Sequence, residues 1–164
     1  MSERFGGSRL GAVASALLAV ALAAAAAWLF WDSGARRNAV RAGDEAAQAA
    51  RDSIVAILSY QPATAQQSLE AAANDRLTGR FLDDYAQLVK TVVVPEAVGK
   101  RITATATVPA AAVVSADAHH AVVLAYVDQT MAVGSAAPTQ TNSAVRVTMD
   151  NLDGRWLISG FDPI

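Results

Sequence analysis

The hydrophobic pattern divides the chain into three successive parts. Residues 10–31 read LGAVASALLAVALAAAAAWLFW and carry no charge. Residues 32–94 repeat apolar side chains every three or four positions, the spacing that places them on one face of a helix. From residue 101 onward, apolar and polar side chains alternate as in strands. The pattern therefore predicts a membrane span, then helices, then consecutive strands.

The apolar run is long enough to remain in a membrane. Residues 10 to 31 would form about 33 Å of helix at roughly 1.5 Å per residue, against a hydrocarbon core of about 30 Å. A cleaved signal peptide has a shorter apolar region, of about 7–15 residues, before a small-residue site that the alanines could mimic. The bulky side chains Trp28, Phe30 and Trp31 are typical of a membrane interface. We predict an uncleaved single-pass anchor; cleavage, the alternative, would release a secreted domain.

Charge does not decide the orientation of this anchor, because arginines lie on both sides of it. The folded mass follows the anchor, which is the usual arrangement when the N-terminus stays inside. We therefore expect residues 1–9 in the cytoplasm and the C-terminal domain on the extracytoplasmic side of the cell membrane.

The helical part contains three expected helices. Residues 32–60 hold helix formers without proline and predict a stalk that enters the domain, with Pro62 as its end. Thr64 and Gln67 have the spacing of a capping box, so a short second helix should begin there. A third helix should start near the LTGRF motif and end at Pro95. Five apolar side chains would share one face of it: Leu77, Phe81, Tyr85, Leu88 and Val92.

Five short segments have the alternation of strands. They read RITATATV, AAAVVSA, HAVVLAYVDQTM, SAVRVTMD and RWLISGF. The third is apolar on both faces near its centre and should be a central strand. Gly154 in NLDG should supply the positive φ of a tight hairpin. Because short connections make neighbouring strands antiparallel, residues 61–164 predict an α+β domain with helices packed on a curved antiparallel sheet.

Composition and motifs supply few candidates for chemistry. A formal charge of −2 argues against a nucleic-acid partner, and the absence of cysteine removes disulfides and thiolates. His119 and His120 are neighbours on a strand or in a turn and cannot chelate one metal ion together. Asp83 and Asp84 should face water while Tyr85 points inward. We predict no catalytic, cofactor-binding or metal-binding residue and no enzymatic activity.

Several short motifs, taken in order, resemble one known family. The stalk ends in ILSY, and LTGRF, TATV, VLAYVDQT and DGRWLISGFDPI follow it. Together they resemble the Mce-associated membrane proteins of actinobacteria, where Mce stands for mammalian cell entry. The resemblance covers nearly the whole chain. It implies a single-pass anchor that carries a cone-shaped domain like nuclear transport factor 2, of the SnoaL type.

The resemblance also implies a role and partners. Such proteins accompany Mce complexes, which import lipids or sterols, and would aid the assembly or stability of those complexes. Mce subunits and the membrane are then the expected partners. Two alternatives stay open: an inner-membrane scaffold of a type IV secretion-like system, and a cone that binds a small apolar ligand or acts as an isomerase. A lipid or sterol ligand would need an apolar cavity. The candidate lining residues, which we expect rather to fill the core, are Tyr60, Phe81, Tyr85, Tyr126 and Trp156.

Overall fold

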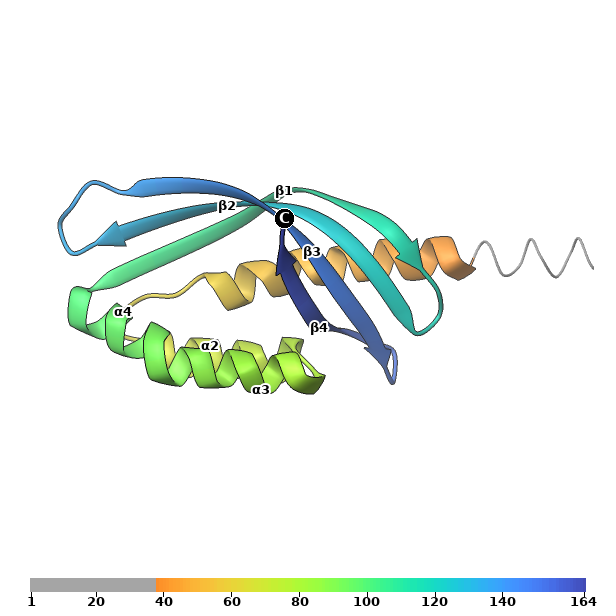
Figure 1. Ribbon diagram of the computed structural model, residues 1–164, viewed down its shortest axis with the longest axis horizontal. Helices are drawn as coiled ribbons and strands as arrows, with labels where there is room; N and C mark the ends of the chain where they lie inside the picture. Colours follow the sequence, from red (N-terminus) through yellow and green to blue (C-terminus); the bar gives the residue numbers. More distant parts are fainter. Residues whose placement is uncertain (1–37) are drawn as a thin grey trace, which may run out of the picture. The chain divides into compact units, whose positions relative to one another are not determined.

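A computed structural model describes residues 38–164 (Figure 1). The predicted parts that lie outside this range are the cytoplasmic segment 1–9, the anchor 10–31 and its interface side chains Trp28, Phe30 and Trp31. Among the described residues, no helix combines the length and the apolar character that a membrane crossing requires. Residues 39–164 form one compact unit.

The unit has two layers, helices and an antiparallel sheet. The helical elements are a first helix over residues 38–58, α2 (Ala65–Arg76), α3 (Gly79–Leu88), a π-helical turn η1 (Val89–Val93) and α4 (Val94–Lys100). The strands are β1 (Ile102–Ala116), β2 (His120–Val133), β3 (Thr139–Leu152) and β4 (Arg155–Pro163). They pair in the order β1-β2-β3-β4, and the helices lie on one face of the bent sheet (Figure 1). The predicted α+β class and the central place of the HAVVLAYVDQTM strand are confirmed.

Pro95 does not end the third helix, contrary to prediction. The helix continues through η1 into α4 and ends at Lys100, and the capping residue Arg101 has a φ of 51°. A proline ring clashes with the carbonyl four residues earlier, and its nitrogen has no hydrogen to donate. The wider π turn comes directly before Pro95, which stands in the first turn of α4. The helix therefore continues past the proline.

The segments RITATATV and AAAVVSA form one strand and not two. β1 runs without interruption from Ile102 to Ala116, and its pairing with β2 shifts between Thr107 and Ala110. Pro109 lies inside that shift. A bulge tolerates a residue that cannot donate to the ladder, so the proline bends β1 without ending it. The segment VGSAAPTQTNS, residues 133–143, separates two of the predicted strands, but the loop in it is short because β3 already begins at Thr139.

The core lies between the helices and the inner face of the sheet. Alternation along β3 is confirmed, because Val145, Val147 and Met149 are buried. The first helix supplies four further core side chains: Ala46, Ala50, Ile54 and Ile57. The described part of the predicted stalk therefore packs into the same compact unit as the sheet, from residue 39 onward.

Gly43 lets the first helix approach the sheet closely. A Cβ atom placed on Gly43 would lie 3.3 Å from both γ-methyl groups of Val113 and 3.4 Å from the Cβ of Ala116. In the sequence this glycine is only a weak point in a helix, worth about 1 kcal/mol against alanine. In the fold, Gly43 is a position at which the first helix packs closely against the end of β1.

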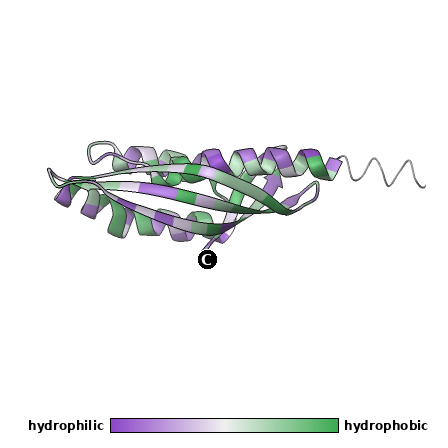
Figure 2. Cartoon of the chain, turned by 90° about the horizontal axis from the view of Figure 1, so that it is seen from above, coloured by the Kyte–Doolittle hydropathy of each residue, from purple (hydrophilic) through white to green (hydrophobic). Residues whose placement is uncertain are grey.

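Backbone groups from the helical layer cover part of both sheet edges. At the β1 edge, Tyr60 and Ala104 exchange two backbone hydrogen bonds of 2.9 Å. At the β4 edge, the Thr78 N–H donates to the Ile158 carbonyl at 2.9 Å. Covered edges discourage pairing with a foreign strand. The described helices leave the outer face of the sheet uncovered (Figure 2).

Candidate functional site

Tyr85 anchors the interior of the domain. Its side chain is 8% exposed, and its hydroxyl donates a 2.6 Å hydrogen bond to the carbonyl of Ile57 at the end of the first helix. Burial raises the pKa of Tyr85 far above the ordinary tyrosine value, and the nearby Tyr60 raises it further. Burial raises the pKa of Tyr60 as well. Both phenols therefore stay protonated, and Tyr85 acts as a structural donor.

Phe81 joins Tyr85 to the last strand. The ring centroids of Phe81 and Tyr85 are 6.2 Å apart, and those of Phe81 and Phe161 are 6.1 Å apart with nearly parallel planes. Phe161 was not among the expected lining residues. A register shift in the β3–β4 pairing lets Ile158 and Phe161 both face inward three positions apart. Strict alternation from Ile158 would have placed Phe161 outward.

Trp156 belongs to the core, as expected. It is 7% exposed, and its indole nitrogen has no hydrogen-bond partner among the described residues. Ser53 is fully buried on the first helix, and its hydroxyl also has no hydrogen-bond partner among the described residues. Four of the five expected lining residues thus gather at or beside a core filled by large fully buried side chains, chiefly Ile54, Leu69, Leu77, Met149 and Ile158.

Tyr126 is the exception among these five residues. It is 54% exposed and points from β2 to the outer face, so it neither fills the core nor lines an interior pocket. It borders an outward hollow of about 450 Å³ lined by Pro109, Ala110, Tyr126, Asp128, Asn142, Ser143 and Ala144. Within it, Asn142 Nδ2 donates to Asp128 Oδ1 at 2.5 Å. The period of β2 places Tyr126 and Asp128 on one face, but it does not tell which face the helices cover.

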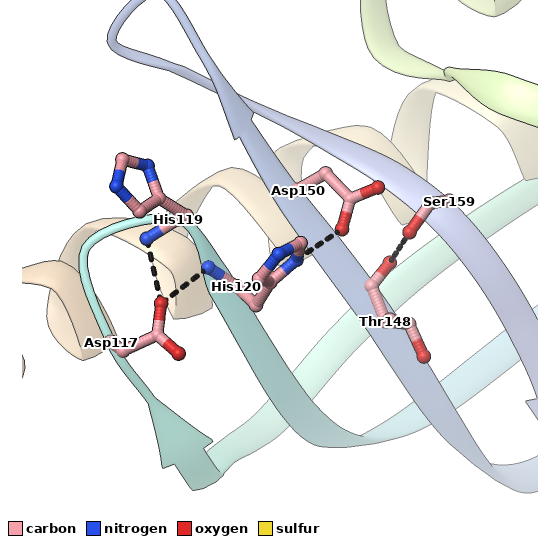
Figure 3. A network of polar contacts seen from close by, with 6 residues as sticks. All are labelled: Asp117, His119, His120, Thr148, Asp150 and Ser159. Atoms are coloured by element: carbon pink, nitrogen blue, oxygen red, sulfur yellow. Dashed lines mark hydrogen bonds and ion pairs between the residues drawn. The ribbon is translucent and has the colours of Figure 1, made fainter.

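The two histidines lie at the β1–β2 turn (Figure 3). Asp117 Oδ1 accepts the backbone N–H groups of His119 at 2.7 Å and His120 at 2.8 Å, and these bonds lower the pKa of Asp117. His120 Nδ1 lies 2.9 Å from Asp150 Oδ1 on the neighbouring strand. The predicted turn is confirmed. The arrangement closes a hairpin and leaves both rings exposed.

The acidic residues do not converge on a reaction centre. Asp83 and Asp84 are exposed on α3, and Asp84 pairs with Arg80 along the helix surface, while Tyr85 points inward as expected. Within residues 38–164, no three His, Cys, Asp or Glu side chains lie together as a metal site would require.

Comparison with known sequences yields a family and named relatives. A family model described as "Uncharacterized protein Rv1363c/MT1408-like" matches residues 8–162. Outer membrane protein Rv1973 of Mycobacterium tuberculosis is 54% identical over 147 residues, which cover 90% of this chain and 91% of the relative. The protein Rv1362c of the same species is 42% identical over 134 residues, which cover 81% of this chain and 57% of that protein.

Comparison with solved structures identifies the fold. A periplasmic fragment of TraM superimposes with a TM-score of 0.61 at 12% identity, over 73% of this chain and 95% of the fragment. The periplasmic domain of DotI gives 0.60 at 15% identity, over 72% and 91%. An IcmL-like type IV secretion system protein from Legionella pneumophila gives 0.60 at 12% identity, over 72% and 90%. At these identities the likeness concerns the fold.

Proposed function

The chain belongs to the Rv1363c/MT1408-like family. We propose that it is a non-enzymatic accessory subunit of an Mce-type lipid or sterol import complex, the role that the resemblance of its motifs implies. The N-terminal anchor would hold the protein in the cell membrane, with the α+β domain on the extracytoplasmic side. The domain would aid the assembly or stability of the complex by contact with its other subunits. Its partners would be Mce subunits.

The observation that carries this proposal is the fold that follows the apolar run. Residues 10–31 have the length of a membrane span. The domain behind them has the fold of the periplasmic domain of DotI and of a periplasmic fragment of TraM. The name of Rv1973, outer membrane protein, also supports a place in the cell envelope. A tethered domain on that side is suited to hold an envelope complex together.

The interior supports a non-enzymatic role. Aliphatic side chains fill the layer between helices and sheet, and the buried Tyr85 hydroxyl is already engaged with Ile57. An isomerase of this architecture would need an acid or base inside the cone with a shifted pKa. Asp128, the acidic residue of β2, lies on the outer face and not inside the cone. The proposal includes a likeness of the domain to the cone-shaped domains of nuclear transport factor 2 and of SnoaL.

A second candidate is a scaffold of a type IV secretion-like system. The TM-score of 0.60 with an IcmL-like type IV secretion system protein favours it. The 54% identity to outer membrane protein Rv1973 of Mycobacterium tuberculosis supports a place in the cell envelope, which both candidates share. The partner proteins distinguish the two candidates.

The test is purification of the full-length protein from its native membranes in mild detergent, followed by mass spectrometry. The affinity tag belongs at the N-terminus, because the N–H of Ile164 donates to the Ala144 carbonyl and the C-terminus is part of the sheet. Mce subunits and their permease in the eluate are the expected result. Secretion-system subunits would favour the second candidate, and recovery of the protein alone would overturn both.

Two controls sharpen this experiment. The intact mass of the purified chain shows whether residues 10–31 are retained, which the anchor requires. A strain that produces only residues 1–31 should lose lipid uptake and the integrity of the complex. Normal uptake with an intact complex in that strain would refute an accessory role for the domain.

A further inference from the structure

The outer face of the sheet carries an unusual group of side chains around Tyr126. Tyr126 on β2 pairs with Ala110 on β1 and with Ala144 on β3, so a half-exposed aromatic ring stands between two alanines. One step along the strands on one side, Leu124 pairs with Arg146; one step on the other side, Asp128 pairs with Asn142. We name this group the outer patch: Ala110, Leu124, Tyr126, Asp128, Asn142, Ala144 and Arg146.

The outer patch has the composition of a contact surface. The small side chains beside Tyr126 leave the hollow of about 450 Å³, and an exposed tyrosine beside a hollow is a typical anchor of protein interfaces. β2 is apolar on both faces although described helices cover only its inner face. An uncovered apolar stripe with charges at its rim marks an interaction site more often than bare surface.

The charges of the outer patch are arranged for self-complementarity. Among the described residues, no carboxylate lies within ion-pair distance of Arg146, which is exposed. Asn142 holds one carboxylate oxygen of Asp128 through its Nδ2, which leaves the other carboxylate oxygen and the Asn142 Oδ1 as acceptors. Arg146 and Asp128 stand one register step from the Tyr126 row, on opposite sides of it.

We propose that the outer patch binds the outer patch of a second copy of this chain, with Tyr126 on the two-fold axis. An axis that crosses the strands along the row of Ala110, Tyr126 and Ala144 exchanges the two sides of that row. It therefore places Arg146 of one copy opposite Asn142 and beside Asp128 of the other. The symmetry forms this charged contact twice, and each Tyr126 ring enters the partner's hollow.

Such a contact agrees with the physics of packed sheets. Two sheets pack face to face about 10 Å apart with strands turned by roughly 30°, a spacing that an arginine and an aspartate can bridge. A guanidinium presents two N–H groups in a fork, which fits one carboxylate oxygen and one amide oxygen side by side. This association is independent of the partners proposed above, because those could bind any other surface of the domain.

The chain contains no cysteine, so a single introduced thiol reports the contact directly. In Tyr126→Cys, the two thiols face each other across the axis between sheets about 10 Å apart, which is too far for a disulfide. A short bifunctional maleimide added to full-length protein in native membranes should therefore give a cross-linked pair of twice the chain mass. The matched control is Val98→Cys, because Val98 is 57% exposed on α4, on the helical side of the domain. Equal cross-linking of both variants, or cross-linking of the Tyr126→Cys variant to a different protein, would overturn the proposal.

Charge reversal tests the same contact without loss of the tyrosine. The mass of purified full-length protein in detergent is measured by light scattering across micromolar concentrations. Arg146→Asp and Asp128→Arg should each weaken the dimer at least about tenfold, and the double variant should recover most of the wild-type affinity. A wild-type chain that stays monomeric, or a double variant no better than the singles, would refute the proposed symmetry.

Discussion

Replacement of Tyr85 by phenylalanine removes one buried hydroxyl and keeps the ring. The hydroxyl donates to the Ile57 carbonyl at 2.6 Å in a site that is 8% exposed. A typical intramolecular hydrogen bond contributes about 1 kcal/mol, and a buried acceptor without a partner costs about 1–3 kcal/mol. We expect Tyr85→Phe to lower the free energy of unfolding by about 1–2 kcal/mol at pH 7.

The pH dependence of this difference follows from the raised pKa of Tyr85. An unfolded tyrosine loses its proton near pH 10, whereas the folded phenol keeps it to higher pH. The stabilisation by the hydroxyl is therefore complete below about pH 10 and is lost as the pH rises above it. One pH unit above the unfolded pKa, the loss amounts to about 1.4 kcal/mol. The gap between wild type and Tyr85→Phe should nearly close at pH 11.

The assay is urea unfolding of the full-length protein in detergent, followed by circular dichroism at pH 7 and at pH 11. Tyr126→Phe is the matched control, because its hydroxyl makes no hydrogen bond within residues 38–164 and its ring is 54% exposed. That control should match wild type at both pH values. A gap for Tyr85→Phe that stays constant from pH 7 to pH 11 would refute the assignment of Tyr85 as a buried, protonated donor.

Substitutions at three further positions test the fold. Gly43→Ala should leave stability nearly unchanged, because the gain in helix propensity offsets a 3.3 Å contact with the Val113 methyl groups, while Gly43→Leu should cost about 1–3 kcal/mol in urea unfolding. Gly154→Val should cost about 1–2 kcal/mol, because Gly154 has φ of +82° in the β3–β4 turn. Asp117→Ala should lower stability at pH 7 but leave it less sensitive to acid below about pH 4, since the lowered pKa of Asp117 means that its contribution disappears as the pH falls. An unchanged acid profile would contradict this role.

Two prolines show why local signals give an incomplete account of this fold. Pro95 and Pro109 each predict a break, and each lies inside a continuous element. A π turn before Pro95 and a bulge at Pro109 supply local geometry in which the missing N–H costs little. Both devices depend on what the neighbouring chain segments allow, so propensity alone could not reveal them. Phe161 was missed for a related reason, because a shift in the pairing register changes the face on which it lies.

Local sequence patterns by themselves determined the α+β order, the buried faces of β1 and β3, the tight turn at Gly154 and the inward direction of Tyr85. Each of these follows from the side-chain period or the turn residues of one segment, whatever its neighbours are. Only the tertiary structure decided that the first helix belongs to the domain from residue 39 onward, and that Tyr126 and Asp128 face outward. A strand that is apolar on both faces could be buried by helices on either one. Its period separates the two faces but does not show which of them the helices cover.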